Sequence, residues 1–164
     1  DHGRDVATGF HHGKQTDRER TIWFSTNSTR LNKHYHAHNP GIVDIYPSLA
    51  RHMQLDIPQE LQYELDGVPF IDEVSIADGR AGLKDDKLTV EWTPIELEGN
   101  VEILISTTNN FKTKGTDQYV SLGTIENKAR KAEIKLPLSL QKKKFYKVVF
   151  KAKNNTLNRW IVLQ

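Results

Sequence analysis

Cysteine is absent from the 164 residues, so the chain can form neither a disulfide nor a thiolate metal site. No apolar run approaches the roughly 20 residues that cross a bilayer, so we predict no membrane span. The basic clusters at residues 128–131 and 142–144 have no aromatic residues between their charges. We interpret them as solvated surface, and we predict no nucleic-acid partner.

The first thirteen residues, in contrast, combine metal-ligand side chains with glycines. Asp1, His2, His11 and His12 supply carboxylate and imidazole groups, which zinc and other divalent metals accept as ligands. Glycine at position 3 lets the backbone turn sharply or approach a bound group closely. The pattern predicts part of a metal site.

Three short motifs carry a resemblance to a known family. They are Asp1-His2-Gly3 followed by His12-Gly13, then the segment at residues 42–53, then the turn at residues 65–69. Together they resemble the alkaline phosphatase superfamily, with the closest likeness to its type I phosphodiesterase and nucleotide pyrophosphatase branch. The likeness covers residues 1–71, and it implies the C-terminal segment of an α/β catalytic domain.

The resemblance also implies roles for individual residues. Asp1 and His2 would ligate the metal ion that activates the nucleophile, and His12 would ligate a second ion. His11 is the less favoured ligand, although a register shift of one residue keeps it open. Lys14 would contact the phosphate of the substrate. The implied cofactor is a pair of zinc ions, or another divalent metal.

Three neighbouring charged residues receive weaker assignments. Arg4 and Asp5 differ from the small or apolar residues of some relatives, so we place them around the metal ligands at most. Arg18, like Lys14, could reach a bound phosphate through charge-assisted hydrogen bonds, and a plain surface role for each remains open.

The nucleophile and remaining ligands of the family come from segments that precede the Asp-His-Gly motif. We therefore expect this chain to be a C-terminal fragment that lacks the N-terminal part of its catalytic domain, contains no catalytic residue and is inactive alone. The parent enzyme would hydrolyse a small-molecule phosphate ester. A sulfatase fragment and a non-catalytic β-sandwich binding module are the alternatives. The expected location is periplasmic or extracellular, because such modules commonly accompany exported hydrolases.

Within residues 1–71 the sequence predicts three local structures. The apolar run at residues 21–25 predicts a buried strand. Residues 26–41 read as a loop carrying His34, His36 and His38, whose role the sequence leaves undecided. Helical spacing after Asp44 then predicts a helix over residues 45–55, with the apolar face of Ile45, Leu49 and Met53 packed on a sheet and with Arg51 and Gln54 pointing outward.

Residues 72–164 change to the alternating pattern of a β-sandwich. Expected strands lie at residues 87–94, 101–106, 119–123, 131–136, 145–153 and 159–163. Tyr146, six residues after Leu140, resembles the tyrosine corner of fibronectin type III domains, and Trp92 resembles the core tryptophan of that fold. The expected fold class is α+β overall: an α/β alkaline-phosphatase-like remnant followed by an all-β fibronectin type III-like sandwich.

Overall fold

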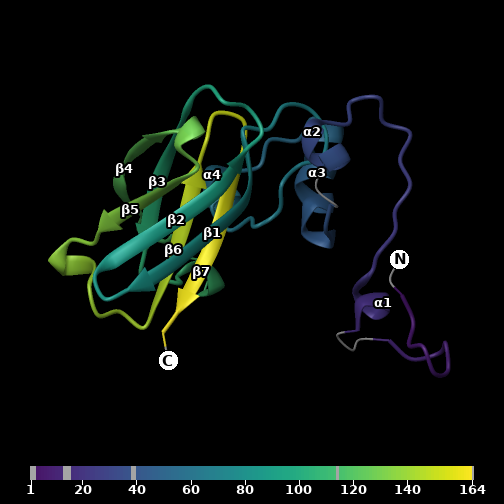
Figure 1. Ribbon diagram of the computed structural model, residues 1–164, viewed down its shortest axis with the longest axis horizontal. Helices are drawn as coiled ribbons and strands as arrows, with labels where there is room; N and C mark the ends of the chain where they lie inside the picture. The colour runs from purple at the N-terminus through teal and green to yellow at the C-terminus, as the bar shows by residue number, and fades with distance from the viewer. Residues whose placement is uncertain (1–2, 13–15, 38–39, 114, 164) are drawn as a thin grey trace. The chain divides into compact units, whose positions relative to one another are not determined.

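A computed structural model describes residues 3–12, 16–37, 40–113 and 115–163, which belong to two compact units. The first unit, Asp1–Arg30, contains one short helix, α1 (Asp17–Arg20). The second unit, Leu31–Gln164, contains all other elements (Figure 1). Its helical elements are α2 (Lys33–Ala37), η1 (Ile42–Asp44), α3 (Ile45–His52), α4 (Gln59–Gln62), η2 (Phe111–Thr113), η3 (Asn127–Ala129) and η4 (Leu138–Leu140).

The strands of the second unit form two antiparallel sheets (Figure 1). One sheet has three strands in the order β1-β2-β5, and the other has four in the order β4-β3-β6-β7. The strands are β1 (Ile76–Lys84), β2 (Lys87–Pro94), β3 (Asn100–Ser106), β4 (Val120–Glu126), β5 (Lys131–Lys135), β6 (Phe145–Lys151) and β7 (Thr156–Val162).

A single hydrophobic cluster joins the two sheets. Leu88, Val90 and Trp92 of β2 contribute to it from one sheet, and Val148 and Phe150 of β6 contribute from the other. All five side chains are buried, and they occupy alternate positions along their strands, as the period of a β-strand requires. The arrangement is compatible with the predicted two-sheet sandwich. Strands β2 to β7 overlap the predicted ranges, whereas β1 was not predicted.

Two aromatic residues of this core are held by polar contacts. The indole Nε1 of Trp92 donates to the backbone oxygen and the Oδ1 of Asn127, at 3.0 and 2.8 Å. The hydroxyl of Tyr146 accepts a hydrogen bond of 3.1 Å from the backbone N–H of Lys143, just before β6 begins. Each ring therefore buries its apolar body while its polar atom finds a partner.

Residues 31–71 pack in the same compact unit as the strands. Arg51 donates from Nη1 to the backbone oxygens of Ile71 and Glu73, at 3.1 and 2.7 Å, and from Nη2 to the backbone oxygen of Asn154. The prediction that Arg51 points outward is thus wrong, because its guanidinium donates hydrogen bonds to three backbone oxygens. The domain boundary predicted at residue 71 separates segments that resemble two different families, and it does not describe compact units. It stays a prediction.

Helix α3 forms where the spacing predicts it, but a different face is buried. Pro47, Ser48 and Ala50 are buried, whereas Leu49 and Met53 keep 51% and 57% of their surfaces exposed. The predicted packing of the apolar face on a sheet is therefore not seen within the described part of the chain. Polar contacts hold the opposite side of α3 instead. They include a hydrogen bond of 2.8 Å from the Phe70 N–H to the Ser48 hydroxyl.

The predicted strand at residues 21–25 is also wrong. Only Ile22 makes an isolated bridge there, and the Trp23 side chain remains 68% exposed. A strand needs a neighbouring strand for its backbone groups, and the described residues of the first unit provide no sheet. Within the described residues, moreover, no helix has the length and apolar character needed to cross a membrane.

Candidate functional site

Most of the predicted metal and phosphate contacts lie outside the described residues. Asp1, His2 and Lys14 are in this group, so their positions stay predictions. His12 is described, and it is exposed in a segment without regular structure. In the described ranges no cluster of three or more His, Cys, Asp or Glu side chains could hold a metal ion. The predicted pair of zinc ions therefore also remains a prediction.

Asp5 organises the loop that leads to His12. Its Oδ1 accepts from the Thr8 N–H at 2.7 Å, and its Oδ2 accepts from the Thr8 hydroxyl at 2.6 Å and from the His11 N–H at 2.9 Å. The Asp5 N–H also donates to the His11 backbone oxygen at 2.8 Å. These bonds fix the backbone immediately before His12. The carboxylate holds protein groups, which agrees with a place beside the metal ligands rather than among them.

Hydrogen bonding also sets the protonation state of Asp5. The side-chain and backbone bonds from Thr8, with those from the His11 and Ala7 backbone, hold the pKa of its carboxyl well below the ordinary value. The loop is therefore held together by a carboxylate that stays ionised at acidic pH.

Gly3 anchors the other end of the predicted ligand segment. Its N–H donates to the Thr21 backbone oxygen at 2.9 Å, and a Cβ at this position would lie 1.7 Å from the Arg18 backbone oxygen. Only glycine allows that approach, as the sequence pattern suggested. Helix α1, which carries Arg18, begins at Asp17, and the hydroxyl of its N-cap residue Thr16 accepts from the Glu19 N–H at 3.3 Å.

The three-histidine segment does not form the extended, one-sided array that a period of two would give. His34 and His36 lie on α2, which replaces the predicted loop, and His38 lies outside the described residues. Nε2 of His34 is 3.3 Å from Oδ2 of Asp44, and both side chains are buried. His36 is exposed. His34 therefore serves the packing of α2 against η1.

Asp44 is a structural centre of the second unit. Its Oδ1 accepts from the Val68 N–H at 2.6 Å, and its Oδ2 accepts from the Gly41 N–H at 2.8 Å. No capping bond runs from its side chain to α3, although Asp44 occupies the predicted N-cap position. The carboxylate thus ties the beginning of α3 to residues 67–70.

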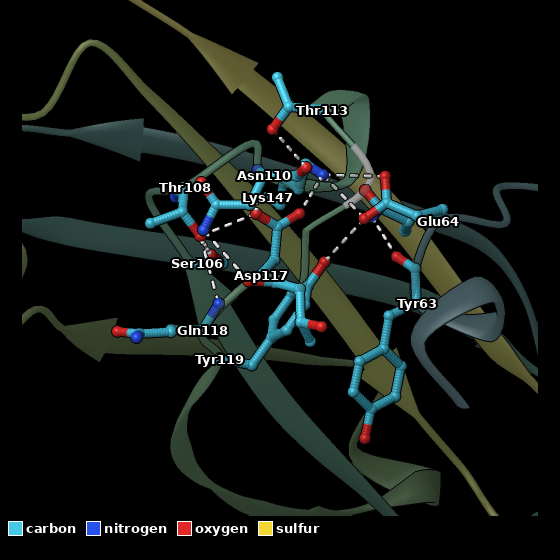
Figure 2. A network of polar contacts seen from close by, with 12 residues as sticks. Tyr63, Glu64, Ser106, Thr108, Asn110, Thr113, Asp117, Gln118, Tyr119 and Lys147 are labelled. Atoms are coloured by element: carbon cyan, nitrogen blue, oxygen red, sulfur yellow. Dashed lines mark hydrogen bonds and ion pairs between the residues drawn. The ribbon is translucent and has the colours of Figure 1, made fainter. Parts of the chain in front are cut away.

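A polar network that the sequence did not reveal lies over the four-stranded sheet (Figure 2). The Nζ of Lys147, a fully buried side chain on β6, contacts Glu64 Oε1 and Oε2 at 2.7 and 2.8 Å and Asp117 Oδ2 at 2.6 Å. The same Nζ lies 4.9 Å from the ring centroid of Trp160. Tyr119 donates its hydroxyl proton to Glu64 Oε1 at 3.3 Å.

The second carboxylate oxygen of Asp117, Oδ1, also belongs to the network. Its Oδ1 accepts from the Thr108 hydroxyl at 2.8 Å and from the Asn110 N–H at 2.7 Å. Burial alone would raise the pKa of Asp117, but hydrogen bonds from Lys147, Asn110 and Thr108 together lower it. The ion pairs of Lys147 with Asp117 and Glu64 therefore hold β6, the loop between β3 and β4 and the segment after α4 together.

An open cavity of about 300 Å³ adjoins this network, between α4 and the loop from β3 to β4. Its lining includes both carboxylate partners of Lys147 and the rings of Tyr63, Phe111 and Tyr119. Sequence reasoning missed it because these residues come from two separate loop regions. One local signal existed: Phe145 and Val149 flank Lys147 on the outward side of β6, which indicates that this side is covered as well.

Comparison of the chain with protein-family models, with curated proteins and with solved structures finds no match. The functional interpretation therefore depends on the residues and their geometry.

Proposed function

We propose that the chain is the C-terminal part of a metal-dependent phosphoric ester hydrolase of the phosphodiesterase and nucleotide pyrophosphatase type. Residues 1–71 would belong to its alkaline-phosphatase-like catalytic domain, and residues 72–164 would form a fibronectin type III-like sandwich. The order of the three N-terminal motifs and the bond between Lys143 and the Tyr146 hydroxyl support these two assignments.

One observation carries the fragment interpretation. Helix α3 exposes Ile45, Leu49 and Met53, the stripe whose spacing is that of a buried helix face. Ile42, Val43, Tyr46 and Leu55 extend the exposed apolar surface on either side. A surface of this kind marks a contact with further protein. We propose that the remainder of the catalytic domain covers it, since residues 42–53 resemble the closing helix of that domain.

In the proposed site, Asp1 and His2 hold one divalent ion and His12 holds another. Bound metal ions of this kind polarise phosphoryl oxygens and lower the pKa of a hydroxyl nucleophile. The Asp5 carboxylate keeps the backbone before His12 in place, and His12 is exposed. Lys14 would bind a phosphate oxygen of the substrate through its ammonium group.

Hydrolysis of bis(p-nitrophenyl) phosphate by the full-length protein, loaded with zinc, tests the proposal. We expect His12→Ala to lower kcat/KM at least about 100-fold, because loss of a metal ligand removes transition-state stabilisation, and to lower the bound zinc content. His52→Ala is the matched control, since His52 is exposed at the end of α3. Activity from residues 1–164 alone would refute the fragment interpretation, and a preference for sulfate esters would refute the phosphodiesterase assignment.

Charge substitutions on α3 test the covered face separately. Leu49→Asp should change the stability of residues 1–164 by no more than about 0.5 kcal/mol, because Leu49 is half exposed there. In the full-length protein the same change should cost about 2 kcal/mol or more, since it would bury a charge in place of a leucine side chain. Equal effects in the two proteins would show that nothing covers this face.

A further inference from the structure

The cavity beside the Lys147 network has aromatic walls. Tyr63 and Tyr119 meet edge to face, with ring centroids 5.0 Å apart and planes at 69°. Phe111, on η2, contributes a third ring and keeps 41% of its surface exposed. A volume of about 300 Å³ is at the small end of ligand-binding pockets and suits one small organic group.

Among the described residues that line the cavity, all charged side chains are acidic. Glu60, Glu64 and Asp117 line it, and the described residues of the lining include neither lysine nor arginine. The ammonium of Lys147 contacts Glu64 and Asp117, and Glu60 is the third carboxylate in the lining. Lys112 is exposed on η2 and does not line the cavity.

The Tyr119 hydroxyl lies at the wall of the cavity and donates to Glu64 Oε1 at 3.3 Å. Burial, followed by the negative charges of Glu64 and Asp117, raises the pKa of Tyr119 well above its ordinary value. Rings and carboxylates together form a surface that attracts a cation, because each ring presents a negative face.

We propose that this cavity binds an organic monocation, with its alkylammonium or guanidinium head between the aromatic rings and the carboxylates. The side chain of a lysine or arginine has this chemistry, and so does a free alkylamine. A sugar would also stack on the rings and donate hydroxyl hydrogen bonds to the carboxylates, but it carries no charge, so the charge–charge attraction favours the cation. This site is independent of the proposed phosphoesterase function.

Titrations of the full chain monitored by NMR, with the amide signals of residues 111, 115 and 119, test the proposal. The probes are N-acetyl-arginine amide, N-acetyl-lysine amide and n-butylamine, with N-acetyl-norleucine amide as the neutral match of lysine. The cations should shift these signals in a saturable manner, and the neutral probe should not. Saturation by the two amides and by butylamine would identify the cationic head as the recognised group, whereas saturation by the amides alone would assign the site to a peptide side chain.

Two variants of exposed residues localise the binding. Phe111→Ala removes one ring, and Glu60→Gln removes one carboxylate charge, and each should weaken binding about tenfold. Leu138→Ala and Glu98→Gln are matched controls, because both residues are exposed outside the cavity. The proposal would be overturned if no cation saturated the signals or if the norleucine probe bound equally well. It would also be overturned if a polyol such as glucose bound instead of the cations, or if the affinity were unchanged in both variants.

Discussion

The ammonium of Lys147 lies 2.7 Å from the carboxylate of Glu64, although 83 positions separate the two residues in the chain. Glu64 follows α4, outside the predicted sandwich, and Lys147 lies on a central strand of it. Asp117, from the loop between β3 and β4, binds the same ammonium. One buried cation thus joins three distant segments, and the four-stranded sheet holds part of residues 31–71 in place.

Replacement of Lys147 by methionine should destabilise the second unit strongly. The change keeps most of the side-chain volume but leaves two poorly exposed carboxylates without their cation, at a cost of about 3–5 kcal/mol. Lys151→Met is the control, because its 3.6 Å pair with Glu102 is partly exposed and should contribute at most about 1 kcal/mol. Urea unfolding measures both. Equal losses would show that the buried network contributes no special stability.

The Asp117 carboxyl gives the network an acid dependence. Its pKa is lower in the folded protein than the ordinary value of 3.8, so the unfolded chain binds more protons at mildly acidic pH. Its contribution to stability is complete above the unfolded pKa and is lost as the pH falls through the folded pKa. Urea unfolding between pH 6 and pH 3 should therefore show a shallower decline for Asp117→Asn than for the original chain. A parallel decline in the variant and the original chain would contradict this assignment.

The Asp5 carboxylate should hold the loop between Asp5 and His11 in place. Asp5→Ala removes the acceptor of the Thr8 and His11 N–H groups, so hydrogen exchange at these two amides should accelerate about tenfold or more. Asp17→Ala is the control in the same unit, because that carboxylate contacts the exposed Arg20 side chain. Unchanged exchange in Asp5→Ala would show that other contacts hold the loop.

Sequence alternation predicted most strands, most clearly β2 and β5, whose more buried and more exposed positions alternate. It did not single out β1, where the register shifts between Ala77 and Arg80 and Asp78 adopts a φ of 51°. A bulge of this kind interrupts the period of two, so the pattern loses its signal although the strand continues. The core tryptophan and the bonded tyrosine were named through the resemblance to fibronectin type III domains, and the alternation of β2 also places Trp92 on its buried side.

Side-chain partners were much harder to predict. The spacing of Ile45, Leu49 and Met53 identified a helix, but a periodic pattern does not reveal what covers the apolar face. Lys147 occupies a polar position of a strand, which by itself indicates solvent. Its burial depends on Glu64 and Asp117, and no local pattern connects residues so far apart. The predicted metal ligands could be named only by resemblance, because carboxylates and imidazoles in a loop carry no periodic signal.

Gly67 should tolerate no side chain. A Cβ there would lie 2.1 Å from the Val43 backbone oxygen, so Gly67→Ala must displace η1 and disturb the neighbouring bond between Asp44 and the Val68 N–H. We expect a loss of about 3 kcal/mol, since the clash is with backbone rather than with a flexible side chain. Gly82→Ala in β1 is the control, because a Cβ there meets nothing within 4 Å. Thermal unfolding of both variants measures the difference, and similar melting temperatures would contradict it.

The Tyr146 hydroxyl should contribute measurably to the stability of the sandwich. Tyr146→Phe preserves the buried ring but removes the acceptor of the Lys143 N–H, so the free energy of unfolding should fall by about 1 kcal/mol. Tyr46→Phe, on the half-exposed surface of α3, should change it by less than about 0.5 kcal/mol. Because the hydroxyl holds the backbone just before β6, hydrogen exchange at the Lys143 amide should also accelerate in Tyr146→Phe alone. If stability fell without that acceleration, the loss would come from altered packing of the ring, and the bond to Lys143 would have no role in fixing the beginning of the strand.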